Sequence, residues 1–340
     1  MSRILLYLWM SLLIVVLGSC QAKEVSSKNK HKVLIVDGQN NHGIWPKTTI
    51  MMKQYLEETG LFEVDVERTR YLWLGPHHDK VEEVSDIKEL LEFYPIDSEI
   101  KYESLDHSRK DSLFSPNFNA YDVVITNFGW QAAPWPDVTI QNFEKYIQDG
   151  GGLVVIHAAN NSWPEWKAYN KMIGLGGWGG RTEKDGPYVY YTDDGEMVID
   201  TIAGNAGSHG PQHEFVITSR AEDHPIMNGL PNQWLHTKDE LYDRLRGPAE
   251  NLTILATAYS DKDQYNGTGR HEPALMAIEH EEGRIFHSIL GHMDYSMECV
   301  GFITTFIRGT EWAASGEVTF TEVPEDFPGH QSINFRKYHK

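Results

Sequence analysis

The sequence contains very little cysteine: Cys20 and Cys299 are the only two such residues among 340. Two thiols cannot build the set of disulfides on which small secreted scaffolds depend, so that class of fold is excluded. A metal site in this chain must therefore use histidine and carboxylate ligands instead of thiolates. The chain has 16 histidines available for such a site.

Basic residues are also scarce. There are 30 Lys and Arg against 49 Asp and Glu, which gives a formal net charge of −19. An excess of negative charge of this size repels phosphate backbones, so the sequence argues against nucleic acid as a partner. Hydrophobic residues make up 40% and charged residues 23% of the chain. These are ordinary globular values, and they exclude a chain that is disordered throughout.

One apolar run is longer than a buried strand, Ile4–Leu17, and it is too short to span a membrane comfortably. Arg3 before it and small residues after it are typical of a secretory signal. The segment Leu17-Gly18-Ser19-Cys20 resembles a bacterial lipobox, which implies a signal peptide at 1–19, lipidation at Cys20 and a polar tether at 20–31. The alternative is an ordinary signal peptide with an incidental cysteine. We expect an exported protein that a lipid anchors in the bacterial cell envelope. The anchor lies at either the periplasmic or the outer-membrane face, and the sequence does not distinguish the two.

Buried strand patterns alternate with helical patterns along most of the chain. The expected strands include 32–37, 62–68, 121–128 and 153–157, and the expected helices include 46–60 and 138–149. This alternation predicts an α/β fold with a mostly parallel sheet and helices on both of its faces.

Two stretches depart from the alternation. Residues 72–119 are long, polar and partly helical at 81–94, which indicates an insertion. Residues 188–218 alternate as antiparallel strands do, with a turn at Asp194-Gly195. Three more strands, 252–258, 274–280 and 284–290, and a helix at 302–314 follow. With no internal repeat, we expect one α/β domain at 32–320 with an antiparallel excursion, and a C-terminal tail at 321–340.

Polar and aromatic side chains follow the strands where these end. His42 follows the first strand, Trp130 follows 121–128, and His292 follows 284–290. His157 directly ends the strand that starts at residue 153. Because the carboxyl ends of parallel strands meet at one edge of the sheet, we expect these side chains to share one site.

Further segments add to this site. His209 lies in a tight turn, and the acids Asp239 and Glu240 lie beside Tyr242. The predicted catalytic residues are His157, His209, Asp239, Glu240 and His292. The predicted ligands of a divalent metal, with zinc the first choice, are His157, His209, His292 and Glu240. The same groups without a metal suit general acid and base work, so both alternatives stay open.

Four more residues are predicted to bind substrate: His42, Asn160, Trp130 and Trp163. Aromatic rings beside amides suit a sugar, since the ring stacks and the amides bind hydroxyls. The alternative for each tryptophan is simple core filling. The glycines of 174–180 do not form a phosphate loop, because no Lys-Ser/Thr follows them, and we predict no nucleotide cofactor.

Six segments together resemble the ThuA-like (trehalose utilisation) family over roughly residues 32–314. They are VLIVDGQNNH, GGLVVIHAAN, SHGPQHEFVI, EDHPIMNGLP, HTKDELYDRL and GRIFHSILGH. The resemblance implies a flavodoxin-like, doubly wound fold similar to class I glutamine amidotransferases. It also implies a role in carbohydrate metabolism, with oxidised (keto) glycosides as substrates. The site residues it carries over are His42, His157, His209, Asp239, Glu240 and His292.

The chain departs from the amidotransferases at their nucleophile, a cysteine at the turn after a strand. Here the matching strand ends in His157-Ala158-Ala159, so glutamine hydrolysis by a thiol is excluded. Two hypotheses follow. The first is an exported hydrolase or lyase that acts on (keto-)glycosides with a His/carboxylate site, with or without a metal. The second is a non-catalytic sugar-binding lipoprotein that serves a partner enzyme or transporter. The sequence leaves the oligomeric state open.

Overall fold

The computed structural model describes residues 30–76 and 87–339. One half of its central sheet consists of six parallel strands in the spatial order β14-β5-β4-β1-β2-β3. They are β1 (His31–Gln39), β2 (Phe62–Trp73), β3 (Glu103–Leu105), β4 (Val123–Thr126), β5 (Gly152–Ile156) and β14 (Gly283–Ser288). Strands β4 and β5 and the centre of β1 are buried along their whole length, as expected for parallel strands that are covered on both faces.

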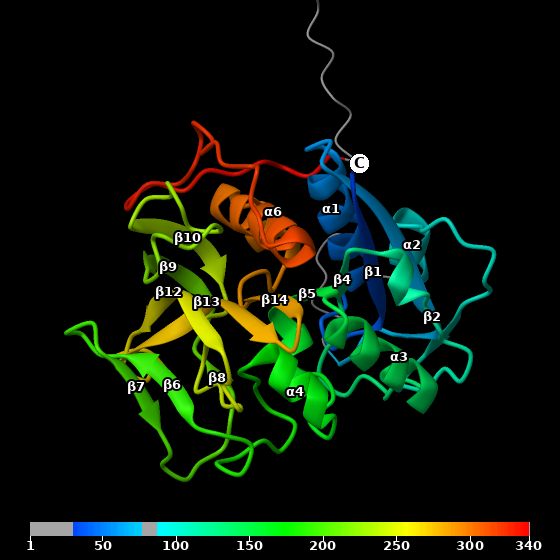
Figure 1. Ribbon diagram of the computed structural model, residues 1–340, viewed down its shortest axis with the longest axis horizontal. Helices are drawn as coiled ribbons and strands as arrows, with labels where there is room; N and C mark the ends of the chain where they lie inside the picture. Colours follow the sequence, from blue (N-terminus) through cyan, green and yellow to red (C-terminus); the bar gives the residue numbers. More distant parts are fainter. Residues whose placement is uncertain (1–29, 77–86, 340) are drawn as a thin grey trace, which may run out of the picture.

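Helices cover both faces of these strands (Figure 1). On one face, α1 (Trp45–Glu57), α5 (Asp294–Met297) and α6 (Val300–Ser315) pack against one another. On the other face lie α3 (Asp137–Gln148) and α4 (Lys167–Ile173), while α2 (Ile87–Phe93) contacts α1. The chain leaves β1 in one direction toward β2 and later returns on its other side through β4 and β5. Ligands in open α/β sheets bind at such a reversal of strand order.

The other half of the sheet is antiparallel. Strand β13 (Arg270–His280) pairs with β14, and β12, β9 and β10 follow it in space. The remaining strands are β6 (Tyr188–Tyr191), β7 (Met197–Asp200), β8 (Ser208–His209), β9 (His213–Ser219), β10 (Gln233–Asp239), β11 (Tyr242–Asp243) and β12 (Leu252–Ser260). The β6–β7 hairpin attaches to β13, and β8 pairs with β11 as a separate ribbon.

The fold prediction is confirmed: the structure is α/β, with a large mostly parallel central sheet, helices on both faces and an antiparallel part. Antiparallel pairing extends beyond residues 188–218, into β10, β12 and β13. For the pair β13 and β14, the physical reason is their short connection. Only Glu281 and Glu282 join His280 to Gly283, and a two-residue turn makes its two strands antiparallel neighbours.

The insertion after β2 contains more regular structure than its sequence predicts. Strand β2 continues to Trp73, and β3 extends the sheet by one parallel strand. The helix expected at 81–94 is present as α2 over Ile87–Phe93, while residues 77–86 lie outside the described part of the chain. Leu72, Leu74 and Trp45 form a small core of their own under this region.

The segment after α6 runs back over the fold to the start of the sheet (Figure 1). The guanidinium of Arg308 donates to the carbonyls of Phe320 and Thr321, and Glu298 binds the backbone N–H of Tyr338. The predicted signal peptide 1–19, Cys20 and the tether as far as residue 29 lie outside the described residues. Within the described part of the chain, no helix combines the length and apolarity that crossing a bilayer needs.

Candidate active site

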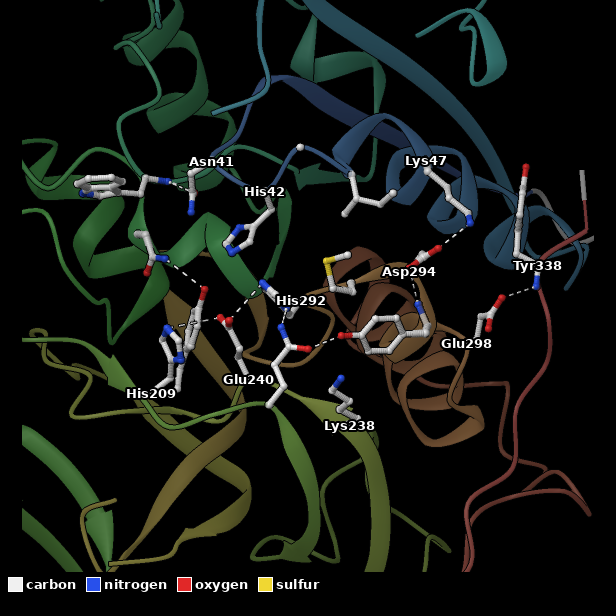
Figure 2. Close-up of a pocket in the computed structure, with 18 of the residues that line it drawn as sticks. Asn41, His42, Lys47, His209, Lys238, Glu240, His292, Asp294, Glu298 and Tyr338 are labelled. Carbon is white, nitrogen blue, oxygen red and sulfur yellow. Dashed lines mark hydrogen bonds and ion pairs between the residues drawn. The ribbon is translucent and has the colours of Figure 1, made fainter. Parts of the chain in front are cut away.

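Four side chains from four strand ends converge on one point, and Figure 2 shows three of them, His42, Glu240 and His292. His42 follows β1, His157 follows β5, Glu240 follows β10 and His292 follows β14. One ligand atom from each of the four lies within 4.8 Å of the ligand atoms of the other three. We call these four residues the cluster. The parallel strands β1, β5 and β14 deliver their following loops to one edge of the sheet, and β10 of the antiparallel half brings Glu240 to the same place.

His157 occupies a strained turn. Its φ is +45°, directly after β5 ends at Ile156, and a residue with a side chain adopts this region only at a cost of about 1–3 kcal/mol. The imidazole is buried, and its Nδ1–H donates to the Ile289 carbonyl at 2.6 Å. Burial, together with the nearby His42, lowers the pKa of His157 to about 3, so the ring is neutral.

The other nitrogen of His157 faces the cluster. Among the described residues its Nε2 has no hydrogen-bond partner, and Glu240 Oε2 lies 3.8 Å away, which is too far for a hydrogen bond. A neutral imidazole whose Nδ1 is tied to a carbonyl presents its Nε2 lone pair, which is the form that binds metals.

The other cluster residues are fixed by neighbours in the same way. His42 Nδ1 lies 3.3 Å from Asn40 Oδ1, and its ring meets those of His157 and His292 edge-on or tilted at 5.2 and 4.6 Å. His292 Nδ1 lies 2.9 Å from the amide of Gln212, and its Nε2 lies 3.3 Å from Glu240 Oε1. The three rings and the carboxylate therefore point at one small volume from different sides.

Asp239 holds this arrangement from behind. Its Oδ2 accepts from His236 Nε2 at 2.9 Å and from Gly291 N at 2.8 Å. Its Oδ1 accepts from Glu240 N at 2.9 Å and from His292 N at 3.1 Å. Burial raises the pKa of Asp239, but its bond to His236 and the charge of that ring outweigh burial and bring the pKa to about 2. One buried carboxylate thus fixes the backbones that carry Glu240 and His292.

His209 lies beside the cluster on the β8–β11 ribbon. Register pairs it with Tyr242, whose ring also packs on His157 at 4.1 Å. Its Nδ1–H donates to the carbonyl of Gly210, and its Nε2 lies 3.8 Å from Glu240 Oε2. With 38% of its side chain exposed, His209 is more accessible than His157 and His292 of the cluster.

His42, Glu240 and His292 of the cluster line a cavity of about 1130 Å³, and His157 lies behind them, outside its lining. Near the cluster, its walls carry the amides of Asn41 and Asn161 and the rings of Trp130 and Trp178. At the far end it is lined by charged side chains already in contact with each other. Lys47 bonds to Asp294 at 2.6 Å and Lys337 bonds to Glu298 at 2.6 Å.

Most predicted site residues line this cavity, and three of the four predicted ligands, His157, Glu240 and His292, belong to the cluster. The four-residue cluster contains His42, which we predicted for substrate, and not His209, which we predicted as a ligand. Asp239 is fully buried and binds backbone instead of lining the cavity. Trp130 lines the cavity as predicted for a substrate-binding residue.

Two predicted substrate-binding residues lie elsewhere. Asn160 is buried with its side chain against His287 Nε2 at 3.0 Å, because the short helical turn after His157 points it into the core. Its neighbour Asn161 lines the cavity instead. Trp163 packs on Trp135 at 4.9 Å and donates to the Ala133 carbonyl. It is therefore part of the hydrophobic core, which is the alternative that we gave for each tryptophan.

Several cavity residues were not predicted from the sequence. Trp178 lies in the glycine-rich stretch 174–180, which we predicted not to form a phosphate loop, and Gln212 lies in a loop without a recognisable motif. Lys47 is inside α1, and its partner Asp294 is 247 residues away. Lys337, Tyr338 and His339 reach the cavity from the predicted tail. A terminal segment that packs over a site has no local sequence pattern from which this packing could be predicted.

The cluster suits a metal ion. It offers three imidazoles and one carboxylate, which matches the nitrogen and oxygen ligands of divalent transition metals such as zinc. The buried Nε2 of His157 also indicates a metal ligand, because a buried polar atom without a partner costs free energy unless a bound ligand supplies that partner. Asn40, Gln212 and the Ile289 carbonyl orient the rings from outside, as partners of metal-binding histidines do.

Comparisons with known proteins agree on one family. The family profile described as trehalose utilisation (ThuA) matches residues 71–313. A crystal structure of a ThuA-like protein from Parabacteroides merdae is 39% identical, with a TM-score of 0.75 over 90% of this chain and 98% of that one. One from Bacteroides uniformis is 16% identical, with a TM-score of 0.49 over 86% and 96%. A search of curated proteins found no match.

Proposed function

The chain belongs to the ThuA (trehalose utilisation) family, and from this premise we propose that it is a carbohydrate-active enzyme with a metal-dependent His/carboxylate site. Its substrates in this proposal are glycosides, in particular oxidised (keto) glycosides, and its reaction is a lyase or hydrolase reaction. The observation that carries the proposal is the convergence of three imidazoles and one carboxylate at a large cavity.

In this proposal His42, His157, Glu240 and His292 hold a divalent ion, with zinc the first choice. When bound, such an ion would act as a Lewis acid toward a sugar carbonyl or lower the pKa of a water molecule. Tyr242 packs on the ring of His157 and, being fully buried, keeps that side of the site dry. A dry wall strengthens every electrostatic interaction of the ligands.

His209 is the residue that we assign to proton transfer. Its Nδ1–H is fixed by the Gly210 carbonyl, so the lone pair of a neutral ring lies on Nε2, on the side of Glu240. In an elimination, Nε2 accepts the proton from the carbon next to the ketone, a C=C bond forms as the glycosidic C–O bond breaks, and the departing oxygen takes a proton from water. A partly exposed base can exchange that proton with solvent between turnovers.

The walls near the cluster suit a sugar. Trp130 and Trp178 offer apolar faces for a pyranose ring, and Asn41 and Asn161 offer amides for its hydroxyls. Amidotransferase chemistry is not part of the proposal, although we infer an amidotransferase-like fold. The turn after β5 carries His157 where those enzymes carry their nucleophile, and Cys299 is buried.

The proposal is tested by a screen of oxidised and unoxidised glycosides with and without a chelator. We expect stoichiometric metal in the purified protein, and turnover of at least one keto glycoside that the chelator abolishes and added metal restores. His209→Ala should lower kcat by roughly 10²–10⁴-fold while metal content stays unchanged. A metal-free protein that binds glycans without turning them over would instead favour the second hypothesis, a sugar-binding protein that serves a partner enzyme or transporter.

We also propose that the protein is exported and lipid-anchored at Cys20, on the basis of the apolar run and lipobox-like segment at its start. Expression of the full-length chain in a bacterium, followed by separation of membranes, tests this directly. Cys20→Ala should move the protein from the membrane fraction to the aqueous fraction. Equal membrane association of the two forms would contradict the lipid anchor.

A further inference from the structure

A second hollow adjoins the main cavity on the side of His209. Its volume is about 480 Å³, and it shares Trp178 and His209 with the main cavity. Tyr265 and Asn266 form its outer side, and the turn at 207–211 forms its floor. The exposed ring of His209 therefore stands between two hollows, with the cluster beside it. A ligand that reaches the cluster has room on both sides of His209.

Trp178 is held in place as a wall of this hollow. Its φ is +52°, which is unfavourable for a bulky residue, and its backbone N–H donates to the Ala206 carbonyl. A Cβ on Gly207 would lie 2.6 Å from Trp178 N and 2.7 Å from its ring, so the packing requires glycine there. The ring lies 4.7 Å from Tyr242 and 6.0 Å from His209. The half-buried indole thus joins the hollow to the cluster.

Tyr265 stands on the opposite side, 78% exposed on the loop 261–269. Although the ring is exposed, the loop is tied down. Asn266 Nδ2 donates to the His209 carbonyl at 3.3 Å, and Arg244 donates to the Asn266 carbonyl at 2.8 Å. Thr268 Oγ1 donates to the buried carboxyl of Glu272 at 2.8 Å. An exposed aromatic ring on an anchored loop gives a ligand a stacking surface with little loss of backbone entropy.

We propose that this hollow is a subsite for a second sugar ring of the glycoside, so that the bond between the two rings lies at the cluster. The proposal rests on the proposed function for the glycoside itself. The hollow's chemistry selects a neutral ring: apart from His209 and Tyr265, none of its residues is titratable, and the rest of the lining is Trp178, Pro211, Gly, Ser and Asn. A phosphate or a carboxylate would find no Lys or Arg side chain among these residues.

The experiment compares trehalose, which has two rings, with methyl α-glucoside, which has one. Each is used unoxidised and with one ring oxidised to a ketone, and binding is measured by calorimetry on chelator-treated and on metal-loaded protein. Tyr265→Ala should weaken binding of the two-ring probes by about 3–10-fold and change the one-ring probes by less than about 2-fold. The matched control is Tyr259→Ala, since Tyr259 is partly exposed on β12 and packs on His271 away from both hollows. We expect it to change neither.

Equal losses for the one-ring and two-ring probes would overturn the subsite, as would unchanged two-ring binding in Tyr265→Ala, or no binding of any two-ring probe. Because Tyr265 is so exposed, its replacement leaves the core intact, and a thermal melt verifies this. The readout is binding, so the two proposals fail separately. A protein that turns over no glycoside but keeps the Tyr265-dependent preference for two rings loses the enzymatic proposal and keeps the subsite.

Discussion

The two ends of the main cavity use similar groups in different ways. At the far end, Lys47 and Asp294 approach to 2.6 Å, as do Lys337 and Glu298, so each charge is neutralised by a direct contact. At the cluster, Glu240 lies 3.3 Å from His292 and 3.8 Å from His157, and the ligand atoms surround a shared volume. The charged groups at the far end therefore satisfy one another, whereas the four cluster residues are placed so that they could hold a metal ion.

The two ends also come from different parts of the fold. The cluster residues follow β1, β5, β10 and β14, whose backbones are fixed by the sheet. The far end is made by α1, α5 and the tail, which meet only through side chains and a few backbone bonds (Figure 2). Rigid strand ends are suited to ligands that need sub-ångström placement, and packed helices and tails are suited to shaping a cavity. The substitutions that follow should cost progressively less free energy of metal binding or of folding.

The largest effect is expected for Glu240→Gln. This change removes the one carboxylate of the cluster while keeping its size, so affinity for Zn²⁺ should fall by at least about 100-fold, beyond the usual effect of changing an outer partner. Competition with a chromophoric chelator measures it. Glu298→Gln is the matched control, an acid in the same cavity that pairs with Lys337, and it should retain full affinity. Equal losses in both variants would mean that the two ends do not differ.

The dependence of the free energy of unfolding on pH distinguishes the buried, neutral His287 behind the cluster from the charged pairs at the far end. Burial lowers the pKa of His287 to about 4, while its Nδ1–H donates to the Ile173 carbonyl. The unfolded chain, with a pKa near 6.5, takes up this proton first, so stability falls as pH drops from about 6.5 toward 4. The contribution between pH 7 and 4.5 is about 2 kcal/mol.

His287→Gln should remove that part of the pH dependence. Urea unfolding at pH 7 and pH 4.5 gives the free energy of unfolding for both proteins, and the drop should be about 2 kcal/mol smaller in the variant. The wild-type protein at the same two pH values is the reference, so a lower overall stability of the variant does not affect the comparison. An unchanged drop would show that His287 takes up its proton in the folded state.

A smaller effect is expected for Asp239→Asn. The amide keeps one oxygen but cannot accept all four hydrogen bonds that fix Glu240, His292, Gly291 and His236. Affinity for Zn²⁺ should fall by about 10-fold, the lower end of the range for outer partners of a metal site. His236→Gln keeps a hydrogen-bond donor toward Asp239, so it should lose less affinity for Zn²⁺. It replaces Asp239→Asn in this test if Asp239→Asn does not fold. A folded Asp239→Asn with unchanged affinity would contradict the positioning role.

The fold was largely predictable because its signals are local. Runs such as Val33–Val36 and Leu153–Ile156 are apolar enough to indicate buried parallel strands, and a glycine follows the last residue of α4 and of α6. Strand order in the antiparallel half was less predictable. Pairing of β12 with β9 and of β10 with β9 depends on contacts between distant segments, which no local period encodes.

The site was predictable to the extent that it follows strand ends. His157 and His292 were found because each ends or directly follows a strand that its composition reveals. The presence of His42 in the cluster in place of His209 was not predictable. It depends on the β8–β11 ribbon, which holds the His209 side chain in a more exposed position beside the cluster. Asn160 and Asn161 are adjacent and chemically identical, and only the helical turn decides which one faces the cavity.

The smallest effect on the cluster is expected for Lys47→Met, which separates the two ends most directly. Methionine preserves most of the buried volume but leaves Asp294 without its cation, and that carboxylate is only 14% exposed. The free energy of unfolding should fall by about 1 kcal/mol, measured in urea, because the pair is partly shielded from solvent. Affinity for Zn²⁺ should stay within about 2-fold, since Lys47 neutralises Asp294 and not Glu240. The Lys47→Met/Asp294→Asn double variant should regain part of the lost stability, because it removes the unpaired charge. If Lys47→Met instead reduced metal affinity as much as Glu240→Gln does, the far end would belong to the ligand site and the contrast between the two ends would be lost.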